Sequence, residues 1–79
     1  MAIMQELVTH IAKGLVDQPD EVATTMSEED ETVTIKLSVA QDDLGKVIGK
    51  QGRTARAMRT LLSTAAEKEG KKSRLDIVE

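Results

Sequence analysis

The chain has 79 residues, with 11 basic and 14 acidic side chains, a formal net charge of −3, and neither cysteine nor aromatic residues. A chain of this length forms one domain with a thin core. Because it has no cysteine and only one histidine, disulfides, thiolate zinc sites and histidine metal clusters are excluded. We therefore expect one domain over residues 1–79, stabilised by aliphatic packing and without a metal or a cofactor.

The first segment, residues 4–16, carries apolar side chains at intervals of three and four, the pattern of an amphipathic helix. These side chains are Met4, Leu7, Val8, Ile11, Ala12, Leu15 and Val16. The run is too short for a membrane span and lacks the basic start of a signal peptide, so the sequence favours a cytoplasmic protein without a membrane partner. Pro19 should end the helix within residues 17–20, because proline cannot continue the hydrogen-bond ladder.

Two segments then alternate apolar and polar residues, which predicts strands. The alternation is weak at residues 22–26 and strong at residues 33–39, where the apolar positions are Val33, Ile35, Leu37 and Val39. The polar stretch Ser27–Asp30 between the two segments predicts a turn. The two strands should therefore form an antiparallel hairpin.

Two helices and a last strand complete the predicted order α-β-β-α-α-β. The helices are expected at residues 41–48, where Asp42 and Asp43 favour the positive N-terminal end, and at residues 53–68, closed by Gly70. The longer helix should bury Ala55, Met58, Leu61, Leu62, Ala65 and Ala66. The last strand is expected at residues 74–78. Since the two helices form a crossover long enough for parallel pairing, we expect an α+β fold with a three-stranded mixed sheet and three helices on one face.

Between these two helices, Gly49 and Gly52 enclose Lys50 and Gln51. Residues without a β-carbon let a ligand approach the first amides of a helix, which have no intrahelical partners. A helix start of this kind attracts phosphate, the more so beside cations. The loop therefore predicts an anion site.

The distribution of charge favours the same site. Lys46–Arg59 contains five basic residues and no acidic one, whereas seven acidic residues and no basic one lie between Lys13 and Lys36. At 100° per residue, Arg53 and Arg56 should project to solvent beside the glycine loop. The local field at the loop is therefore positive although the net charge is negative.

Two common phosphate motifs do not fit this loop. A Walker loop needs four residues between its glycine and the Gly-Lys pair and a hydroxyl residue after the lysine, but Gly45 and Gly49 enclose three and Gln51 follows Lys50. The dinucleotide fingerprint is absent, and the loop joins two helices rather than a strand and a helix. From the residues alone, two other interpretations remain: the glycines only turn the chain between the two helices, and the arginines only form a solvated helix face.

The run LGKVIGKQGR at residues 44–53 resembles the signature of KH domains, in which a Gly-x-x-Gly loop clamps about four single-stranded nucleotides. The element order resembles the type II KH topology of bacteria. With the Asp-x-Pro-Asp turn at 17–20 and the run at 52–57, the chain is similar to the small stand-alone bacterial KH proteins of the KhpA family. The resemblance implies a single KH domain over residues 1–79, with its core motif at about 31–79 and an N-terminal helix and strand at 3–26.

The resemblance also implies roles for individual residues. The loop residues 49–52 would hold the sugar–phosphate backbone, Val47 and Ile48 would form the apolar floor under the bases, and Arg53 and Arg56 would extend the basic rim. The expected RNA-binding set is Lys46, Val47, Ile48, Gly49, Lys50, Gln51, Gly52, Arg53 and Arg56. The absence of aromatic residues fits this family, because RRM domains and many OB-folds stack bases on aromatic side chains.

The function implied by the resemblance is single-stranded RNA binding, in an RNA chaperone or post-transcriptional regulator linked to cell-wall growth and cell shape. The family associates with itself or with a larger KH protein of the KhpB type. The acidic segment Ser27–Glu31 should border the groove and weaken binding by one copy, so that dimerisation supplies affinity. The alternative is a KH-fold assembly module with incidental RNA contact. No acid, base or nucleophile constellation indicates an enzyme, and no small-molecule substrate is expected.

Overall fold

The computed structural model describes residues 2–78. Its elements follow the predicted order: α1 (Ala2–Leu15), β1 (Ala23–Glu29), β2 (Thr32–Ser38), α2 (Leu44–Ile48), α3 (Arg53–Lys68) and β3 (Lys72–Val78). Short 3-10 turns lie at η1 (Pro19–Glu21), η2 (Gln41–Asp43) and η3 (Lys50–Gly52). As predicted, α1 ends before Pro19, and Gly70 follows α3 with a φ of 70°. Within residues 2–78, none of the helices has the length and apolar character needed to cross a membrane.

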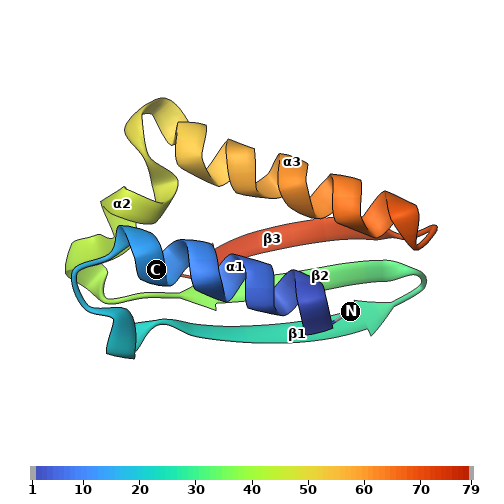
Figure 1. The fold of residues 1–79 in the computed structure, drawn as a ribbon, viewed down its shortest axis with the longest axis horizontal. Helices are drawn as coiled ribbons and strands as arrows, with labels where there is room; N and C mark the ends of the chain where they lie inside the picture. The colour runs from blue at the N-terminus through green and yellow to red at the C-terminus, as the bar shows by residue number, and fades with distance from the viewer. Residues whose placement is uncertain (1, 79) are drawn as a thin grey trace.

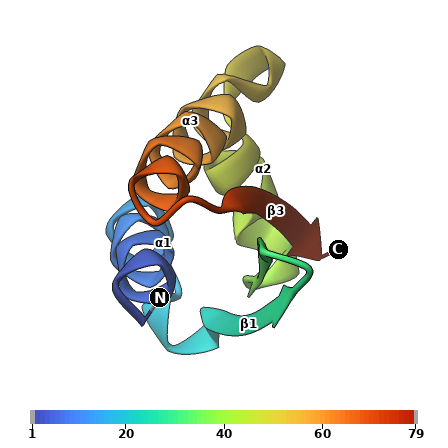
Figure 2. The same ribbon diagram turned by 90° about the vertical axis from the view of Figure 1, so that its right-hand side faces the viewer.

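The strands of this part of the chain form one mixed sheet in the order β1-β2-β3. β1 and β2 pair antiparallel, with Met26 opposite Ile35, and β2 and β3 pair parallel, with Ile35 opposite Leu75. The helices α1, α2 and α3 lie on one face of the sheet, as Figures 1 and 2 show. The predicted α+β fold is therefore confirmed, including the parallel pairing across the α2–α3 crossover.

The core lies between the sheet and the helices, and the inward residues of β2 form its centre. Most other core side chains come from the apolar stripes of the helices; the cluster is Met4, Val8, Ala12, Val33, Ile35, Leu37, Val47, Met58, Leu62, Ala66 and Leu75. Two residues predicted to be buried are not: Leu15 is 40% exposed and Leu61 48% exposed. A sheet of three strands is too narrow to cover the flanks of both long helices, so apolar residues on these flanks stay outside the core.

The turn between β1 and β2 is shorter than predicted. β1 continues through Glu29, and only Asp30 and Glu31 form the turn, with φ values of 50° and 62°. Two residues of positive φ match the twist of a tight hairpin, which explains why the acidic stretch stays in the strand.

This turn lies at the opposite end of the molecule from the α2–α3 loop (Figure 1). Glu28 forms an ion pair with Lys71 at 2.6 Å, and the Glu31 carbonyl accepts the Lys72 backbone N–H at 3.0 Å. The acidic segment is therefore tied to the residues that follow α3. The length of α3 separates this segment from the glycine loop, whereas β3, which begins at Lys72, lies directly beside it. The expected repulsion of phosphate by the acidic segment therefore stays a prediction for the β3 end of the molecule.

Candidate nucleic-acid interface

The turn from Gly49 to Gly52 has an unusual backbone, because φ is positive at Gly49 (78°), Gln51 (58°) and Gly52 (73°). A β-carbon on Gly49 would lie 2.3 Å from Thr54 Oγ1 and 2.8 Å from the Thr54 backbone N. Both the conformation and this close approach therefore require glycine at position 49. Gly52 takes the left-handed conformation directly before α3. The turn has a fixed shape that exposes its two middle residues.

The amides of the turn differ from the open helix start that the sequence predicts. The Gly52 N–H donates to the Gly49 carbonyl at 3.1 Å, and the Arg53 N–H donates to the Lys50 carbonyl. By contrast, the N–H groups of Lys50 and Gln51 make no backbone hydrogen bond to another residue between 2 and 78. The amides that an anion can reach therefore include those at the tip of the turn, whereas the Gly52 and Arg53 amides are already used.

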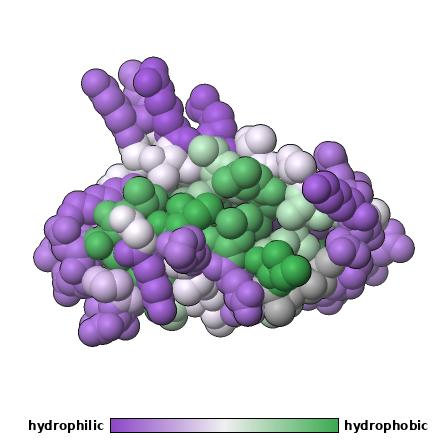
Figure 3. Space-filling model, in the orientation of Figure 1, coloured by the Kyte–Doolittle hydropathy of each residue, from purple (hydrophilic) through white to green (hydrophobic). Residues whose placement is uncertain are grey.

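The side chains around this tip are exposed and mostly cationic: Lys50, Gln51, Arg53 and Arg56. The Arg53 Nη2 donates to Gln51 Oε1 at 3.3 Å. Within residues 2–78, neither Lys50 nor the two arginines form an ion pair with a carboxylate. Figure 3 shows hydrophilic side chains projecting from this end of the molecule. Their positive charge is available to a ligand.

The two apolar residues of the predicted set lie at different depths. Val47 is 0% exposed and belongs to the core, whereas Ile48 is half-buried at the end of α2. A base above this position would contact Ile48, and Val47 would support it from below.

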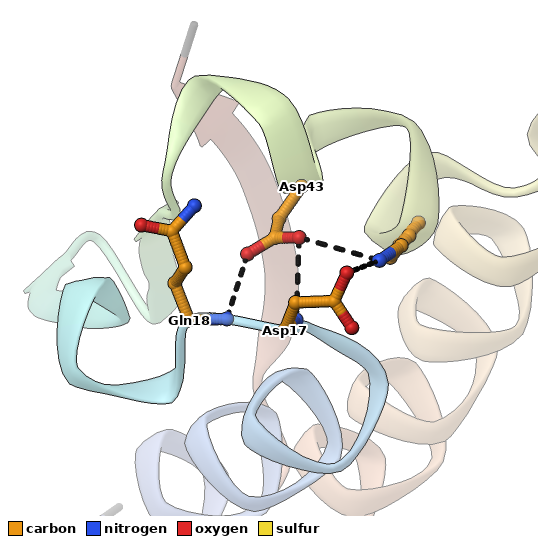
Figure 4. A network of polar contacts seen from close by, with 4 residues as sticks. Asp17, Gln18 and Asp43 are labelled. Carbon is orange, nitrogen blue, oxygen red and sulfur yellow. Dashed lines mark hydrogen bonds and ion pairs between the residues drawn. The ribbon is translucent and has the colours of Figure 1, made fainter.

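Lys46 lies in a different environment from Lys50. Its Nζ forms ion pairs with Asp17 Oδ2 and with Asp43 Oδ1, the second at 3.6 Å. Asp43 is 1% exposed and accepts the backbone N–H groups of Asp17 at 3.2 Å and Gln18 at 3.0 Å (Figure 4). From the sequence, Asp43 is expected only to favour the start of a helix. No local pattern could reveal its partners, because they are 26 and 25 residues away.

The charges of this network stabilise one another. Burial alone would raise the pKa of Asp43, but the two backbone N–H groups and the Lys46 ammonium outweigh it and hold this pKa below its usual value. The hydrogen bond to Asp17 is the main reason why the pKa of Lys46 is raised, against the effect of desolvation. The ammonium of Lys46 is therefore balanced by carboxylates of the protein. The two aspartates do not form a metal centre, since no cluster of three or more His, Cys, Asp or Glu suited to a metal occurs in residues 2–78.

A groove between α3 and the edge strand β3 extends the exposed arginine side of α3. It is lined by Arg59, Ser63, Ser73, Arg74, Leu75 and Asp76. Arg59 follows Arg56 by three residues and lies on the same side of the helix. Arg59 is the last member of the basic segment Lys46–Arg59 that the sequence shows, but the other members of the groove were missed, because only the packing of α3 against β3 brings them together.

Comparison with known proteins identifies the family. The model of the family "KhpA/KhpB, KH domain" matches residues 5–77. The chain is 51% identical over 76 residues to the RNA-binding protein KhpA of Listeria monocytogenes, covering 96% of this chain and 100% of that protein. It is 43% identical over 74 residues to the RNA-binding protein KhpA of Bacillus subtilis, covering 94% of this chain and 91% of that protein.

A solved structure supports the fold. The crystal structure of an Aquifex aeolicus Era variant bound to GDP·AlF4⁻ is similar with a TM-score of 0.61 and 21% identity, over 95% of this chain and 29% of that chain. This likeness concerns the fold alone. The family match spans the Gly49–Gly52 turn and the helices on both sides of it. The chain therefore belongs to the KhpA family of KH-domain proteins.

Proposed function

We propose that this protein binds single-stranded RNA on the surface formed by the Gly49–Gly52 turn, the arginine side of α3 and the α3–β3 groove. The observation that carries the proposal is the exposed turn, where the Lys50 and Gln51 amides have no hydrogen-bond partner, and the neighbouring cations no carboxylate partner, among residues 2–78. Backbone amides and cations at a helix start bind phosphate oxygens. The names of the relatives, RNA-binding proteins, support RNA as the ligand.

Each part of this surface has a distinct role in the proposal. Lys50 and the tip amides hold phosphates, while Arg53, Arg56 and Arg59 follow the strand along α3. Ile48 gives an aliphatic contact to a base, which replaces the aromatic stacking that this chain cannot provide. β3 is an edge strand of the sheet and its residues 73–76 line the same groove, so the outer edge of this strand would offer backbone donors and acceptors to base edges.

The proposal extends to the setting in which the protein acts. We infer a single KH domain over residues 1–79, acting in the cytoplasm as an RNA chaperone or post-transcriptional regulator linked to cell-wall growth and cell shape. Catalysis is not part of this role. A second RNA-binding module, from another copy or from a larger KhpB-type protein, would raise the effective concentration of RNA contacts. The family name, which joins KhpA and KhpB, supports this pairing.

A second candidate function, an assembly module, is favoured by an apolar surface on the other flank of α3. Here a groove between α1 and α3 is lined by Ile3, Met4, Leu61, Thr64, Ala65, Lys68 and Glu69. Ile3 is 76% exposed and Leu61 48% exposed, and Figure 3 shows apolar surface over these helices. Exposed apolar patches of this kind mark protein interfaces. RNA and a protein partner would thus use opposite flanks of one helix.

Titration with short unstructured RNA oligomers tests the proposed function. Single-strand binding should follow a log–log salt slope of roughly −2 to −3.5, for about three to five neutralised phosphates. The double variant Lys50→Asp with Gln51→Asp should abolish binding and leave thermal unfolding unchanged, because both side chains are exposed. The matched control is His10→Asp with Lys13→Asp, which changes the net charge equally on the α1–β1 side. Full affinity in the loop variant would contradict the proposal.

Sedimentation and cell-based complementation separate the two candidate functions. Leu61→Lys should weaken self-association of the protein. A single copy of this variant should still bind the RNA oligomer, because Leu61 lies outside the RNA surface. If the loop double variant complements a deletion strain and Leu61→Lys does not, the assembly function is the important one. The reverse result supports RNA binding as the main role.

A further inference from the structure

We propose that Asp43 is a positioning residue for the Gly49–Gly52 turn: its buried carboxylate holds α2 against the segment that follows α1 and thereby sets where the turn lies. The inference about the turn rests on the geometry, and only its RNA readout rests on the proposed function. Asp43 itself would not contact RNA, because it is 1% exposed.

The carboxylate of Asp43 joins two parts of the chain that the backbone does not connect directly. Its two oxygens accept the N–H groups of Asp17 at 3.2 Å and Gln18 at 3.0 Å, just beyond the end of α1. The ammonium of Lys46, one turn further along α2, contacts both Asp43 and Asp17 (Figure 4). A buried carboxylate is tolerated only with a full set of partners. Moving α2 away from residues 17–18 would therefore leave a buried charge and two amides unpaired.

α2 depends on this contact because the helix is short. It contains five residues, Leu44–Ile48, and a helix of that length has no stability of its own. Asp43 precedes its first residue, and the buried Val47 is its main apolar contact. The last hydrogen bond of α2 is the one from the Gly49 N–H to the Gly45 carbonyl, at 2.8 Å.

The Gly49 amide is thus both the end of α2 and the start of the turn. A tilt or fraying of α2 would move Gly49 and change its fit against Thr54, which tolerates no added atom at this position. Contacts at Asp43 would in this way determine whether the tip amides and Lys50 are placed for an RNA backbone.

Native-state hydrogen exchange with Asp43→Asn tests the role without RNA. In this variant the Gly49 amide should exchange at least about tenfold faster relative to the Leu62 amide in α3, because α2 opens locally. Affinity for an RNA oligomer should fall about tenfold at a temperature where circular dichroism shows a folded protein. The control Val33→Ala removes buried atoms near the hairpin turn; it should speed the exchange of the Leu62 amide at least as much as that of the Gly49 amide, and it should keep the affinity within about twofold.

The outcomes separate cleanly. If Asp43→Asn keeps both the Gly49 protection and the affinity, or if Val33→Ala has the same effects, Asp43 is not a positioning residue. If the wild type binds no oligomer, the proposed function fails, while the exchange comparison still decides the role of Asp43. Should Asp43→Asn not fold, the wild type suffices: the amides of Asp17, Gln18 and Gly49 should exchange through one shared opening, with the same dependence on denaturant. Independent openings would overturn the proposal.

Discussion

Lys46 and Lys50 lie on the two sides of Gly49 and differ in what surrounds their ammonium groups. Lys46 contacts two carboxylates, Asp17 and Asp43. Lys50 is exposed and forms no ion pair within residues 2–78. On the α2 side the charges balance inside the protein, whereas on the α3 side they remain available. The same residue type therefore stabilises the fold on one side of the turn and attracts a ligand on the other.

A substitution at Gly49, the glycine between the two lysines, should have the largest effect on stability and on RNA affinity. Gly49→Ala should lower the free energy of unfolding by about 2 kcal/mol, because a left-handed φ costs other residues roughly 1–2 kcal/mol and the new β-carbon would meet Thr54. RNA affinity should fall by about tenfold or more, since the turn must move. Urea unfolding and oligomer titration measure the two effects.

Gly45 provides the matched control for this substitution. It lies within α2, and no atom is within 4 Å of the position of a β-carbon. Gly45→Ala should therefore raise the free energy of unfolding by about 0.5–1 kcal/mol and keep RNA affinity. Equal losses at both glycines would mean that the shape of the turn is not what matters.

The salt dependence of RNA binding sharpens the comparison of the two lysines. Lys50→Ala should reduce the magnitude of the log–log salt slope by about 0.7, because one phosphate contact is lost. Lys46→Met, which keeps an apolar stem, should lower the melting temperature and leave the slope unchanged. If both variants reduce the salt slope alike, Lys46 leaves its carboxylate partners to bind RNA. The two lysines would then not differ in their roles.

The α2 side can be tested separately by comparing the pH dependence of stability between the wild type and Asp43→Asn. The pKa of Asp43 is lower in the folded protein than its ordinary value of 3.8, so the unfolded chain takes up the proton first as the pH falls. The stabilisation is present above pH 3.8 and is lost as the pH falls through the folded pKa. Asp43→Asn should melt at a lower temperature at neutral pH, and the difference from the wild type should narrow below pH 3.8. If the difference in melting temperature stays the same at every pH, the negative charge of Asp43 does not contribute to stability.

Patterns local in sequence were enough to predict most of the fold. The limits of α3 agree with the prediction at both ends, because its apolar spacing, Gly52 and Gly70 all lie in the segment itself. The position of the glycine turn was equally clear. What the sequence could not reveal depends on packing between distant elements: the partners of Asp43, the groove between α3 and β3, and the exposure of Leu61. The ion pair between Lys46 and Asp17 likewise depends on packing between distant elements.

Substitutions in the acidic turn, which the sequence predicts to repel RNA, should have the smallest effect on RNA affinity. Asp30→Asn with Glu31→Gly should raise the free energy of unfolding by about 0.5–1 kcal/mol, because both positions have positive φ. RNA affinity should change less than about twofold, since the Gly49–Gly52 turn that holds the phosphates lies at the other end of α3, whose 16 residues span roughly 24 Å, beyond the screening length of about 8 Å at physiological salt. A large gain in affinity would place RNA near this turn.

RNA should lie along the Gly49–Gly52 turn and the arginine side of α3. The most direct test is to follow the backbone amide signals of the wild-type protein by NMR while a short unstructured RNA oligomer is added at low salt. The signals should shift at residues 48–53, at Arg56 and Arg59, and at residues 73–76, with little change at residues 5–13 or at the hairpin turn. Unmoved signals at residues 49–52, or shifts gathered on the α1 side, would contradict this placement of the RNA.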